Sequence, residues 1–315
     1  MIQYRTFRNA DPPGLLNIWN EACTGRGAAF LTTNLLLEFF LLAKPFFDPA
    51  GLIVATEEDV LVGFSLAGFA PTSAWNGLDY HRGVTCAVAV LPSHQHRGIG
   101  SELLARAETY LRGRGAIELY AGPQEPLNPF TFAIYGGADS PGFLESEIAA
   151  QSFLEKHSYR RHQARLVLQR SLEAPVLVTD GRFVVMRQRY EVHAGPRHTT
   201  TWWHEAVLGP VELHEYCLTD KGTGQIAARL AIWEMEPYRP RWNQHAIGIV
   251  ALEVLPGLRR QGLGKYLLFQ VLRHLQEQFF TLTEVQVPPD NTAALGLVTG
   301  LGFGTVDVGY SYRRE

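Results

Sequence analysis

The sequence contains one stretch twice: residues 90–104 read VLPSHQHRGIGSELL, and residues 254–268 read VLPGLRRQGLGKYLL. The two stretches align without a gap, so that Val90 matches Val254 and Leu104 matches Leu268, always 164 positions apart. Because this period exceeds the ~20–50 residues of repeats that stack into solenoids, it indicates a duplicated domain. A chain of 315 residues also has room for two domains of ~100–200 residues each.

The composition is that of an ordinary globular protein, and it excludes several classes of function. With 46% hydrophobic and 19% charged residues, both halves can form a core. A net charge of −3 excludes a broad cationic surface, so we expect no nucleic-acid partner. Three widely spaced cysteines, Cys23, Cys86 and Cys217, support neither a disulfide framework nor a metal site.

The sequence predicts neither a signal peptide nor a membrane span. The first residues, MIQYRTFRNADPPG, are polar, and the most apolar stretch, residues 31–47, is interrupted by Asn34, Glu38 and Lys44. We therefore expect a reduced, cytoplasmic protein that acts as a monomer or a homodimer.

Both halves combine strand-like and helix-like patterns in a similar order, which predicts an α/β fold with a mixed sheet in each half. We place the two copies at residues 1–172 and 181–315. In the first copy, the pattern GVTCAVAVLP predicts a strand before the repeated turn, and apolar residues from Leu103 to Leu111 predict an amphipathic helix after it. In the second copy, residues 183–189, FVVMRQR, predict an opening strand.

The two copies differ in length near their last helix. Ala150 and Ala294 mark that helix and are only 144 positions apart, so the first copy holds 20 extra residues. These residues fall before the last helix, in the Pro- and Gly-rich stretch 123–143, PQEPLNPFTFAIYGGADSPGF. This insertion could shape a substrate pocket or be a surface loop without a role, and both interpretations stay open.

The repeated glycine turn has the features of an anion site. A tight turn between a strand and a helix lets several backbone N–H groups converge, and the positive end of the helix dipole adds to their attraction for anions. Gly98 and Gly262 allow a close backbone approach, while Arg97, Arg259 and Arg260 could add charge-assisted hydrogen bonds. The alternative is a plain turn with solvated arginines.

Two nucleotide-binding motifs do not fit this turn. A Walker A loop needs a hydroxyl residue where Tyr266 stands and a first glycine where Arg259 stands. The dinucleotide motif G-x-G-x-x-G needs a last glycine, and Leu103 and Leu267 occupy that position.

The pattern that fits is a strand ending in Val-x-Pro, followed by Gln or Arg and then x-x-G-x-G at the start of a helix. It resembles the acyl-CoA pyrophosphate loop of the GNAT N-acetyltransferase superfamily. In the second copy the resemblance extends to N-x-x-A-x-x-L at Asn291, Ala294 and Leu297. It implies two tandem GNAT-like acyl-CoA N-acyltransferase domains that use acetyl-CoA, and no metal, to acetylate a primary amine of a small molecule or peptide.

The resemblance also implies which residues hold the coenzyme. Backbone N–H groups at the strand ends would polarise the thioester carbonyl, and the loops would hold the pyrophosphate. The implied residues are Val90, Leu91, Gln95, His96, Arg97, Gly98, Ile99, Gly100 and Ser101 in the first copy, and Val254, Leu255, Arg259, Arg260, Gln261, Gly262, Leu263, Gly264, Lys265 and Asn291 in the second.

The common acid and base positions of the family hold other residues in this chain. The usual tyrosine is replaced by Leu154 and Val298, and the usual glutamate by Val84 and Gly248. The substitutes that we consider are Glu253, His81 and Tyr310. Each also has a structural interpretation: a salt bridge for Glu253, a solvated loop side chain for His81, and core packing for Tyr310.

We expect the second copy to carry the chemistry, because it keeps Asn291 where the first copy has Glu147. The first copy would then bind coenzyme or support the fold. The missing tyrosine and glutamate leave a second interpretation open, a non-catalytic module that binds acyl-CoA or regulates.

Overall fold

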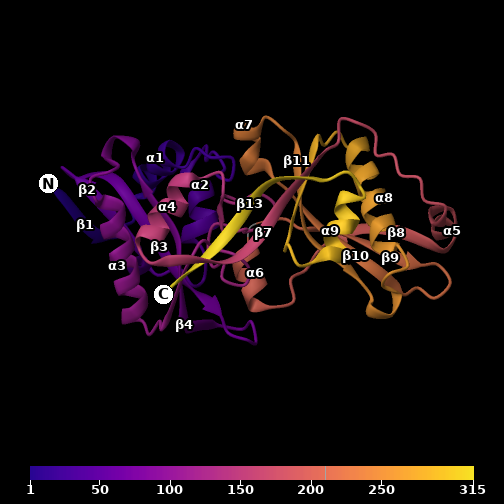
Figure 1. Cartoon of the computed structure of the whole chain (residues 1–315), viewed down its shortest axis with the longest axis horizontal. Coiled ribbons are helices and arrows are strands. Elements are labelled where there is room, and N and C mark those ends of the chain that lie inside the picture. Colours follow the sequence, from indigo (N-terminus) through magenta and orange to yellow (C-terminus); the bar gives the residue numbers. More distant parts are fainter. Residues whose placement is uncertain (210) are drawn as a thin grey trace. The chain divides into compact units, whose positions relative to one another are not determined.

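The structure, a computed structural model, describes residues 1–209 and 211–315, which form two α/β units that do not follow the order of the chain (Figure 1). The first unit comprises Met1–Ala164, Thr199–Pro210 and Val308–Glu315, and the second comprises Arg165–His198 and Val211–Asp307. Each unit has a mixed sheet with helices, which confirms the predicted fold class. The limits 1–172 and 181–315 remain our proposal for the two sequence copies.

The sheet of the first unit has the order β1-β2-β3-β4-β5-β13, with β4 and β5 as a parallel pair. Helix α3 packs on β2, β3 and β4, whereas α1 contacts β3 and β4. The strands are β1 (Ile2–Thr6), β2 (Leu52–Glu57), β3 (Val60–Pro71), β4 (Leu78–Val90), β5 (Glu118–Ala121), β6 (Phe143–Leu144) and the end of β13 (Gly304–Arg314). The helices are α1 (Pro12–Ala22), α2 (Asn34–Leu37), α3 (Ile99–Gly113), α4 (Ile148–Lys156) and α6 (Trp202–Leu208).

The sheet of the second unit repeats this plan in the order β8-β9-β10-β11-β12-β7, with β11 and β12 as the parallel pair. The strands are β7 (Tyr159–Ser171, from residue 165 on), β8 (Tyr190–Pro196), β9 (His214–Asp220), β10 (Ile226–Glu234), β11 (Ala246–Val254) and β12 (Leu282–Val287). The helices are α5 (Arg182–Arg189), α7 (Arg239–Trp242), α8 (Leu263–Glu277) and α9 (Thr292–Thr299). None of the helices among the described residues has the length and apolar character needed to cross a bilayer.

The last strand of each copy pairs with the other copy. Strand β7 ends the first copy, and its residues 166–171 pair with β12 of the second copy. Strand β13 ends the second copy, and its Tyr312 and Arg313 pair with β5 of the first. In Figure 1, the yellow strand β13 accordingly reaches the magenta elements of the first unit. The duplicated sequences therefore fold as interdependent partners.

The insertion interrupts one strand. In the second copy β12 is continuous, and Val285 and Val287 pair with Leu168 and Leu166 of β7. In the first copy the equivalent strand stops at Ala121 opposite Tyr312 and resumes at Phe143 opposite Tyr310. Strand β6 is thus the continuation of β5 along β13, and the extra residues leave the sheet between these two points.

The excursion is buried, so the interpretation of a surface loop is wrong. Phe130, Phe132 and Ile134 are at most 1% exposed. A Cβ on Gly68 of β3 would lie 2.8 Å from the Phe130 ring, and the neighbouring Phe69 packs on α3 instead. The insertion therefore covers the face of the first sheet that is opposite α3.

Helix α5 corrects the expectation of a strand at residues 183–189. Phe183 and Met186 are 7% exposed, whereas Val184 and Val185 are more than 60% exposed. A spacing of three between buried residues follows the helical period and not the strand period. Phe183 packs on Tyr266 and Phe269 of α8, and this contact outweighs the β-propensity of the two valines.

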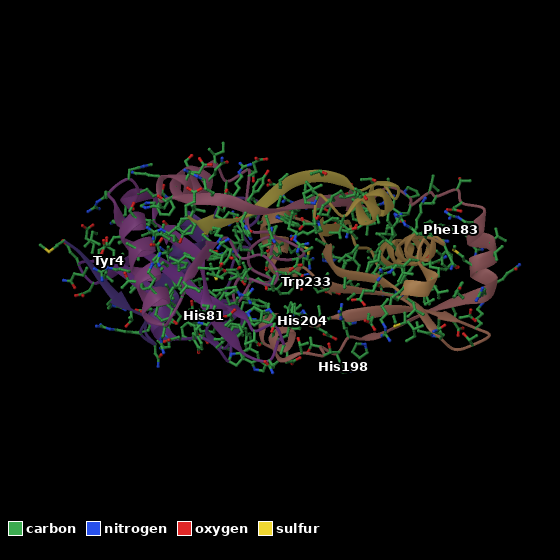
Figure 2. The ribbon with its side chains drawn as sticks, turned by 60° about the horizontal axis from the view of Figure 1, so that its bottom comes forward. Tyr4, His81, Phe183, His198, His204 and Trp233 are labelled. Carbon is green, nitrogen blue, oxygen red and sulfur yellow. The ribbon has the colours of Figure 1, made fainter. Side chains whose placement is uncertain are left out.

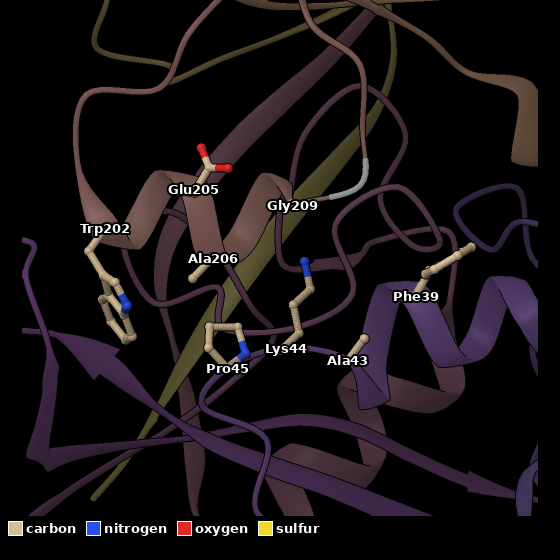
Figure 3. A pocket seen from close by; sticks show the side chains of 8 residues that line it. All are labelled: Phe39, Ala43, Lys44, Pro45, Trp202, Glu205, Ala206 and Gly209. Carbon is tan, nitrogen blue, oxygen red and sulfur yellow. The ribbon is translucent and has the colours of Figure 1, made fainter.

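One lysine of the first unit lies almost completely inside it. The Lys44 side chain lies beside a cavity of about 310 Å³ (Figure 3). Its Nζ donates a hydrogen bond to the Val207 carbonyl at the end of α6. Burial lowers the pKa of Lys44 to about 7. Through its hydrogen bond to the last turn of α6, Lys44 ties this helix to the segment that follows α2.

Lys44 should make the stability of the protein depend on pH. The pKa of an unfolded lysine is ~10.4, so between about pH 7 and 10 the unfolded chain binds more protons than the folded one, and the free energy of unfolding rises with pH. Relative to Lys44→Met, the wild type should gain up to ~1.4 kcal/mol per pH unit in this range. Urea denaturation at pH 7, 8 and 9 measures this difference, and a constant or falling difference would contradict the assignment.

Candidate functional site

The two repeated loops have the same backbone conformation. After β4, a short turn at Pro92–His94 leads to His96 at φ +60° and Gly98 at φ +81°, and α3 begins at the next residue. After β11, Pro256–Leu258 leads to Arg260 at φ +65° and Gly262 at φ +87°, and α8 follows. The left-handed glycine at each helix N-cap directs the chain from the turn into the helix.

Each loop ends at a helix whose first N–H groups have no acceptor within the helix. The first intrahelical bonds are donated by Glu102 to the Gly98 carbonyl, at 3.1 Å, and by Tyr266 to the Gly262 carbonyl, at 3.0 Å. Neither cap glycine has a side chain that could satisfy the preceding donors. The donors before them are the N–H groups of Ile99, Gly100 and Ser101 in the first loop and of Leu263, Gly264 and Lys265 in the second.

At the end of each strand, successive backbone N–H groups point to opposite edges of the strand. The Leu91 N–H donates to the Val62 carbonyl of β3, and the Leu255 N–H donates to the Ala227 carbonyl, both at 2.9 Å. Because successive N–H groups alternate along a strand, those of Val90 and Val254 point to the other edge. That edge has lost its parallel neighbour, since the β4–β5 pairs stop at Thr85 and the β11–β12 pairs stop at Ile249.

Two of the predicted coenzyme residues support the strand ends. The Gln95 amide donates to the Val90 carbonyl at 3.0 Å, and the Arg259 Nε donates to the Val254 carbonyl at 3.2 Å. Gln95 and Arg259 therefore hold equivalent positions in the two loops. Their side chains fix the backbone that presents the free Val90 and Val254 amides.

Arg97 is engaged by the protein itself. Its guanidinium forms an ion pair with Glu57 at 2.8 Å, and His94 contacts the same carboxylate at 3.1 Å. The hydrogen bond from Arg97 is the main cause that lowers the pKa of Glu57 to about 2. The first loop thus presents its backbone donors with this arginine already paired.

Asn291 is the N-cap of α9. Its side-chain oxygen accepts a hydrogen bond from the Ala294 N–H at 3.1 Å, which leaves its amide nitrogen as a donor. The equivalent Glu147 of the first copy instead accepts from the Tyr135 hydroxyl of the insertion at 3.0 Å. The two copies therefore differ at this position in charge and in hydrogen-bonding role.

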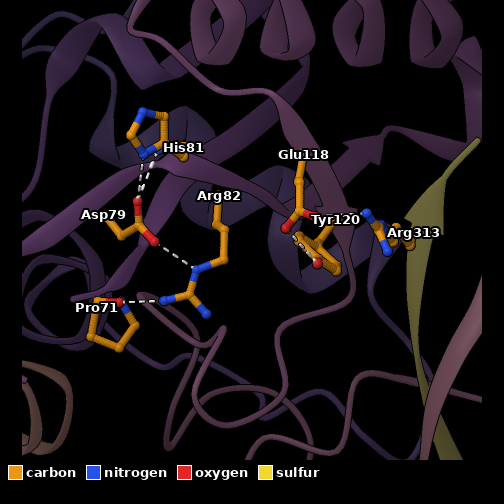
Figure 4. A network of polar contacts seen from close by, with 7 residues as sticks. All are labelled: Pro71, Asp79, His81, Arg82, Glu118, Tyr120 and Arg313. Carbon is orange, nitrogen blue, oxygen red and sulfur yellow. Dashed lines mark hydrogen bonds and ion pairs between the residues drawn. The ribbon is translucent and has the colours of Figure 1, made fainter. Parts of the chain in front are cut away.

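The three proposed acid–base residues do not share a site. Glu253 is exposed on β11 and lies opposite Arg229 of β10 in the sheet register, but the Arg229 guanidinium forms its ion pair with Glu215, at 2.6 Å. His81 lies in β4 and not in a loop, nine residues before Val90, or about 30 Å at ~3.3 Å per residue. It is beside Asp79 at 3.4 Å, in the network drawn in Figure 4. Tyr310 pairs with Phe143 in the first unit, under the Arg161 guanidinium.

One residue that the sequence analysis did not single out lies at the second loop. A Cβ on Gly262 would be 3.2 Å from Nη1 of Arg182, the first residue of α5. A Cβ on Gly98 would meet no atom within 4 Å. A local sequence pattern could not reveal this contact, because it depends on the packing of α5 against α8.

The chain has counterparts among known proteins both in family and in fold. The model of the acetyltransferase (GNAT) family matches it twice, at residues 15–135 and 183–303. A tandem GNAT protein from the clavulanic acid biosynthesis pathway is 18% identical, with a TM-score of 0.69 and with 100% of this chain and 98% of that chain covered. A GCN5-related N-acetyltransferase from Sphaerobacter thermophilus is 13% identical, with a TM-score of 0.65 and coverages of 100% and 95%.

A third solved structure is longer than this chain. It contains a glucosamine N-acetyltransferase region in a fungal multi-domain GH3 β-N-acetylglucosaminidase, with 16% identity and a TM-score of 0.71. The comparison covers 99% of this chain but only 38% of the fungal one. No curated protein sequence matches the chain. At these identities, the structural similarity concerns the fold.

Stability should require a glycine at position 98 because of its left-handed backbone conformation, and not because a side chain there would clash. Gly98→Ala places a Cβ in open space but at φ +81°, so we expect a loss of ~1–2 kcal/mol in the free energy of unfolding. Gly113→Ala, at the other end of α3, is the control and should be neutral or stabilising, because Ala favours the helix. Equal denaturation midpoints for the two variants would contradict this explanation of the turn.

Proposed function

Because the chain belongs to the acetyltransferase (GNAT) family, we propose that it transfers an acetyl group from acetyl-CoA to a primary amine of a small molecule or peptide. The observation that supports this proposal is the set of backbone donors at the second loop. Three N–H groups at the start of α8 have no acceptor within the helix, and the Val254 N–H points to the open edge of the sheet. This donor set suits the diphosphate and the thioester of one extended coenzyme.

In this mechanism the chain works mainly through its backbone. The N–H groups of Leu263, Gly264 and Lys265 would hold the diphosphate, and the Asn291 amide would orient the coenzyme beside α9. The Val254 N–H would polarise the thioester carbonyl and stabilise the oxyanion that forms when a neutral amine attacks. The carbon–sulfur bond then breaks, and the thiolate leaves with the proton that the amine gives up.

Proton transfer would not use the positions that are common in the family. Leu154, Val298 and Val84 are at most 3% exposed and apolar, and Gly248 has no side chain. Solvent water, in contact with the partly exposed end of β11, is the acceptor that this arrangement supports. Glu253, on the same exposed strand end, stays a secondary proposal for the base.

The second copy is the better candidate for catalysis. In the first copy, the strand end at Ala89 and Val90 is buried, and the insertion fills the sheet face opposite α3. In the second copy, residues 250–254 of β11 are partly or fully exposed. A substrate amine needs access to the carbonyl carbon, so this difference favours the second strand end.

A charge placed in the first turn of each helix tests which loop serves turnover. Lys265→Glu and Ser101→Glu both put a carboxylate where it stabilises a helix N-terminus but repels phosphate. We expect Lys265→Glu to lower kcat/KM for acetyl-CoA at least tenfold more than Ser101→Glu does, since ~1.4 kcal/mol of lost binding is a factor of ten. Release of free CoA with a panel of primary amines measures both.

Three results would contradict the proposal that the second loop serves acetyl transfer. A larger loss with Ser101→Glu would move the chemistry to the first copy. Coenzyme binding without turnover on any amine of the panel would favour the non-catalytic module. Equal and negligible losses in both variants, with folding confirmed by thermal denaturation, would contradict the role of the loops.

A further inference from the structure

Helix α5 approaches the second loop through two side chains. A Cβ on Gly262 would lie 3.2 Å from the Arg182 guanidinium and 3.3 Å from the Met186 methyl group. The equivalent glycine of the first loop, Gly98, has no atom within 4 Å of that position. The two loops share a backbone conformation but differ in what lies beside it.

The position of α5 is fixed by packing against α8. The ring of Phe183 lies 5.1 Å from that of Tyr266 and 5.2 Å from that of Phe269, as centroid distances. Phe183, labelled in Figure 2, is 7% exposed. The backbone N–H of Tyr266 donates the first intrahelical hydrogen bond of α8. The contact between the Phe183 and Tyr266 rings therefore holds α5 next to the end of α8 that carries the free N–H groups.

In this structure the Arg182 guanidinium is hydrogen-bonded to a carboxylate of the protein, that of Asp180. Asp180 accepts from Nε and Nη2 of Arg182 at 2.9 and 2.7 Å, and from the Arg182 backbone N–H at 3.1 Å. The hydrogen bond from Arg182 is the main cause that lowers the pKa of Asp180 to about 2, and the charge of Lys265 in the loop acts in the same direction. Asp180 is therefore an internal anion at the loop.

We propose that Arg182 is a phosphate-binding residue of the second loop, and that Asp180 is a built-in competitor which occupies Arg182 until the coenzyme diphosphate displaces it. This inference rests on the proposed function, because it takes the α8 loop as the coenzyme site. The guanidinium fork matches carboxylate and phosphate oxygens equally well, so exchanging one anion for the other needs only a side-chain movement.

The exchange would supply the second loop with a guanidinium from outside the repeated stretch, whereas in the first loop the paired arginine is Arg97 of the loop itself, with Glu57. A diphosphate carries more charge than one carboxylate, so it gains more from Arg182 and Lys265 together than Asp180 does. Asp180 lowers the affinity for weaker anions by the same competition. The loop therefore selects for the diphosphate of the coenzyme over singly charged anions.

The test measures coenzyme binding in full-length protein that carries Ser101→Glu, so that the first loop contributes little heat. Arg182→Ala should raise the Kd for CoA about tenfold or more, and Arg182→Lys should give an intermediate value, because it keeps the charge but not the fork. Asp180→Asn should lower the Kd about threefold or more. Arg187→Ala, an exposed arginine on the same helix, is the matched control and should leave the Kd unchanged.

Fragments of the coenzyme and a double variant test whether Arg182 acts on the diphosphate and whether Asp180 acts through Arg182. The effect of Arg182→Ala should persist with dephospho-CoA, which keeps the diphosphate, and disappear with pantetheine, which has none. Asp180→Asn should have no effect once Arg182 is Ala, because the two side chains act through one ion pair.

The Kd values of the variants separate failure of this inference from failure of the proposed function. A Kd for Arg182→Ala within twofold of that for Arg187→Ala overturns the role of Arg182, and weaker binding by Asp180→Asn overturns the competition. No binding of CoA by the unmodified chain overturns the proposed function and this inference together, whereas normal binding by the parent with unchanged variants overturns this inference alone.

Discussion

The arrangement depends on one backbone feature, a left-handed glycine that turns a strand end into a helix start and leaves the first N–H groups of the helix directed outward. Gly262 places the donors of Leu263, Gly264 and Lys265 at the positive end of α8, and Val254 adds an outward N–H from the strand edge. Because these donors are backbone groups, the site tolerates different side chains in the two copies. The side chains then decide what each copy does with it.

The two copies have diverged around this shared feature. In the first, residues that leave the sheet after Ala121 return at Phe143 and bury Phe130 against β3, so a sheet face becomes core. In the second, β12 is continuous, and residues 250–254 at the end of β11 are partly or fully exposed. The exchange of β7 and β13 makes each sheet depend on the other copy. This dependence gives a physical reason to keep both copies, whichever of them carries the chemistry.

The sequence predicted the strand–turn–helix conformation of both loops, because the residues that form each loop are adjacent in the chain and the pattern occurs twice. It also located the insertion near residues 123–143 from two offsets. It could not predict the exchange of β7 and β13, since strand partners are chosen by long-range packing. For the same reason Val184 and Val185 suggested a strand where Phe183 and Met186, packed on α8 and the second loop, form a helix. The role that we propose for Arg182 depends on that helix.

The central claim is that the second loop holds the coenzyme through its backbone. A crystal structure grown with acetyl-CoA tests this most directly. We expect the diphosphate oxygens within hydrogen-bond distance of the N–H groups of Leu263, Gly264 and Lys265, and the thioester oxygen near the Val254 N–H. A coenzyme bound elsewhere, with this loop occupied only by solvent, would contradict the account.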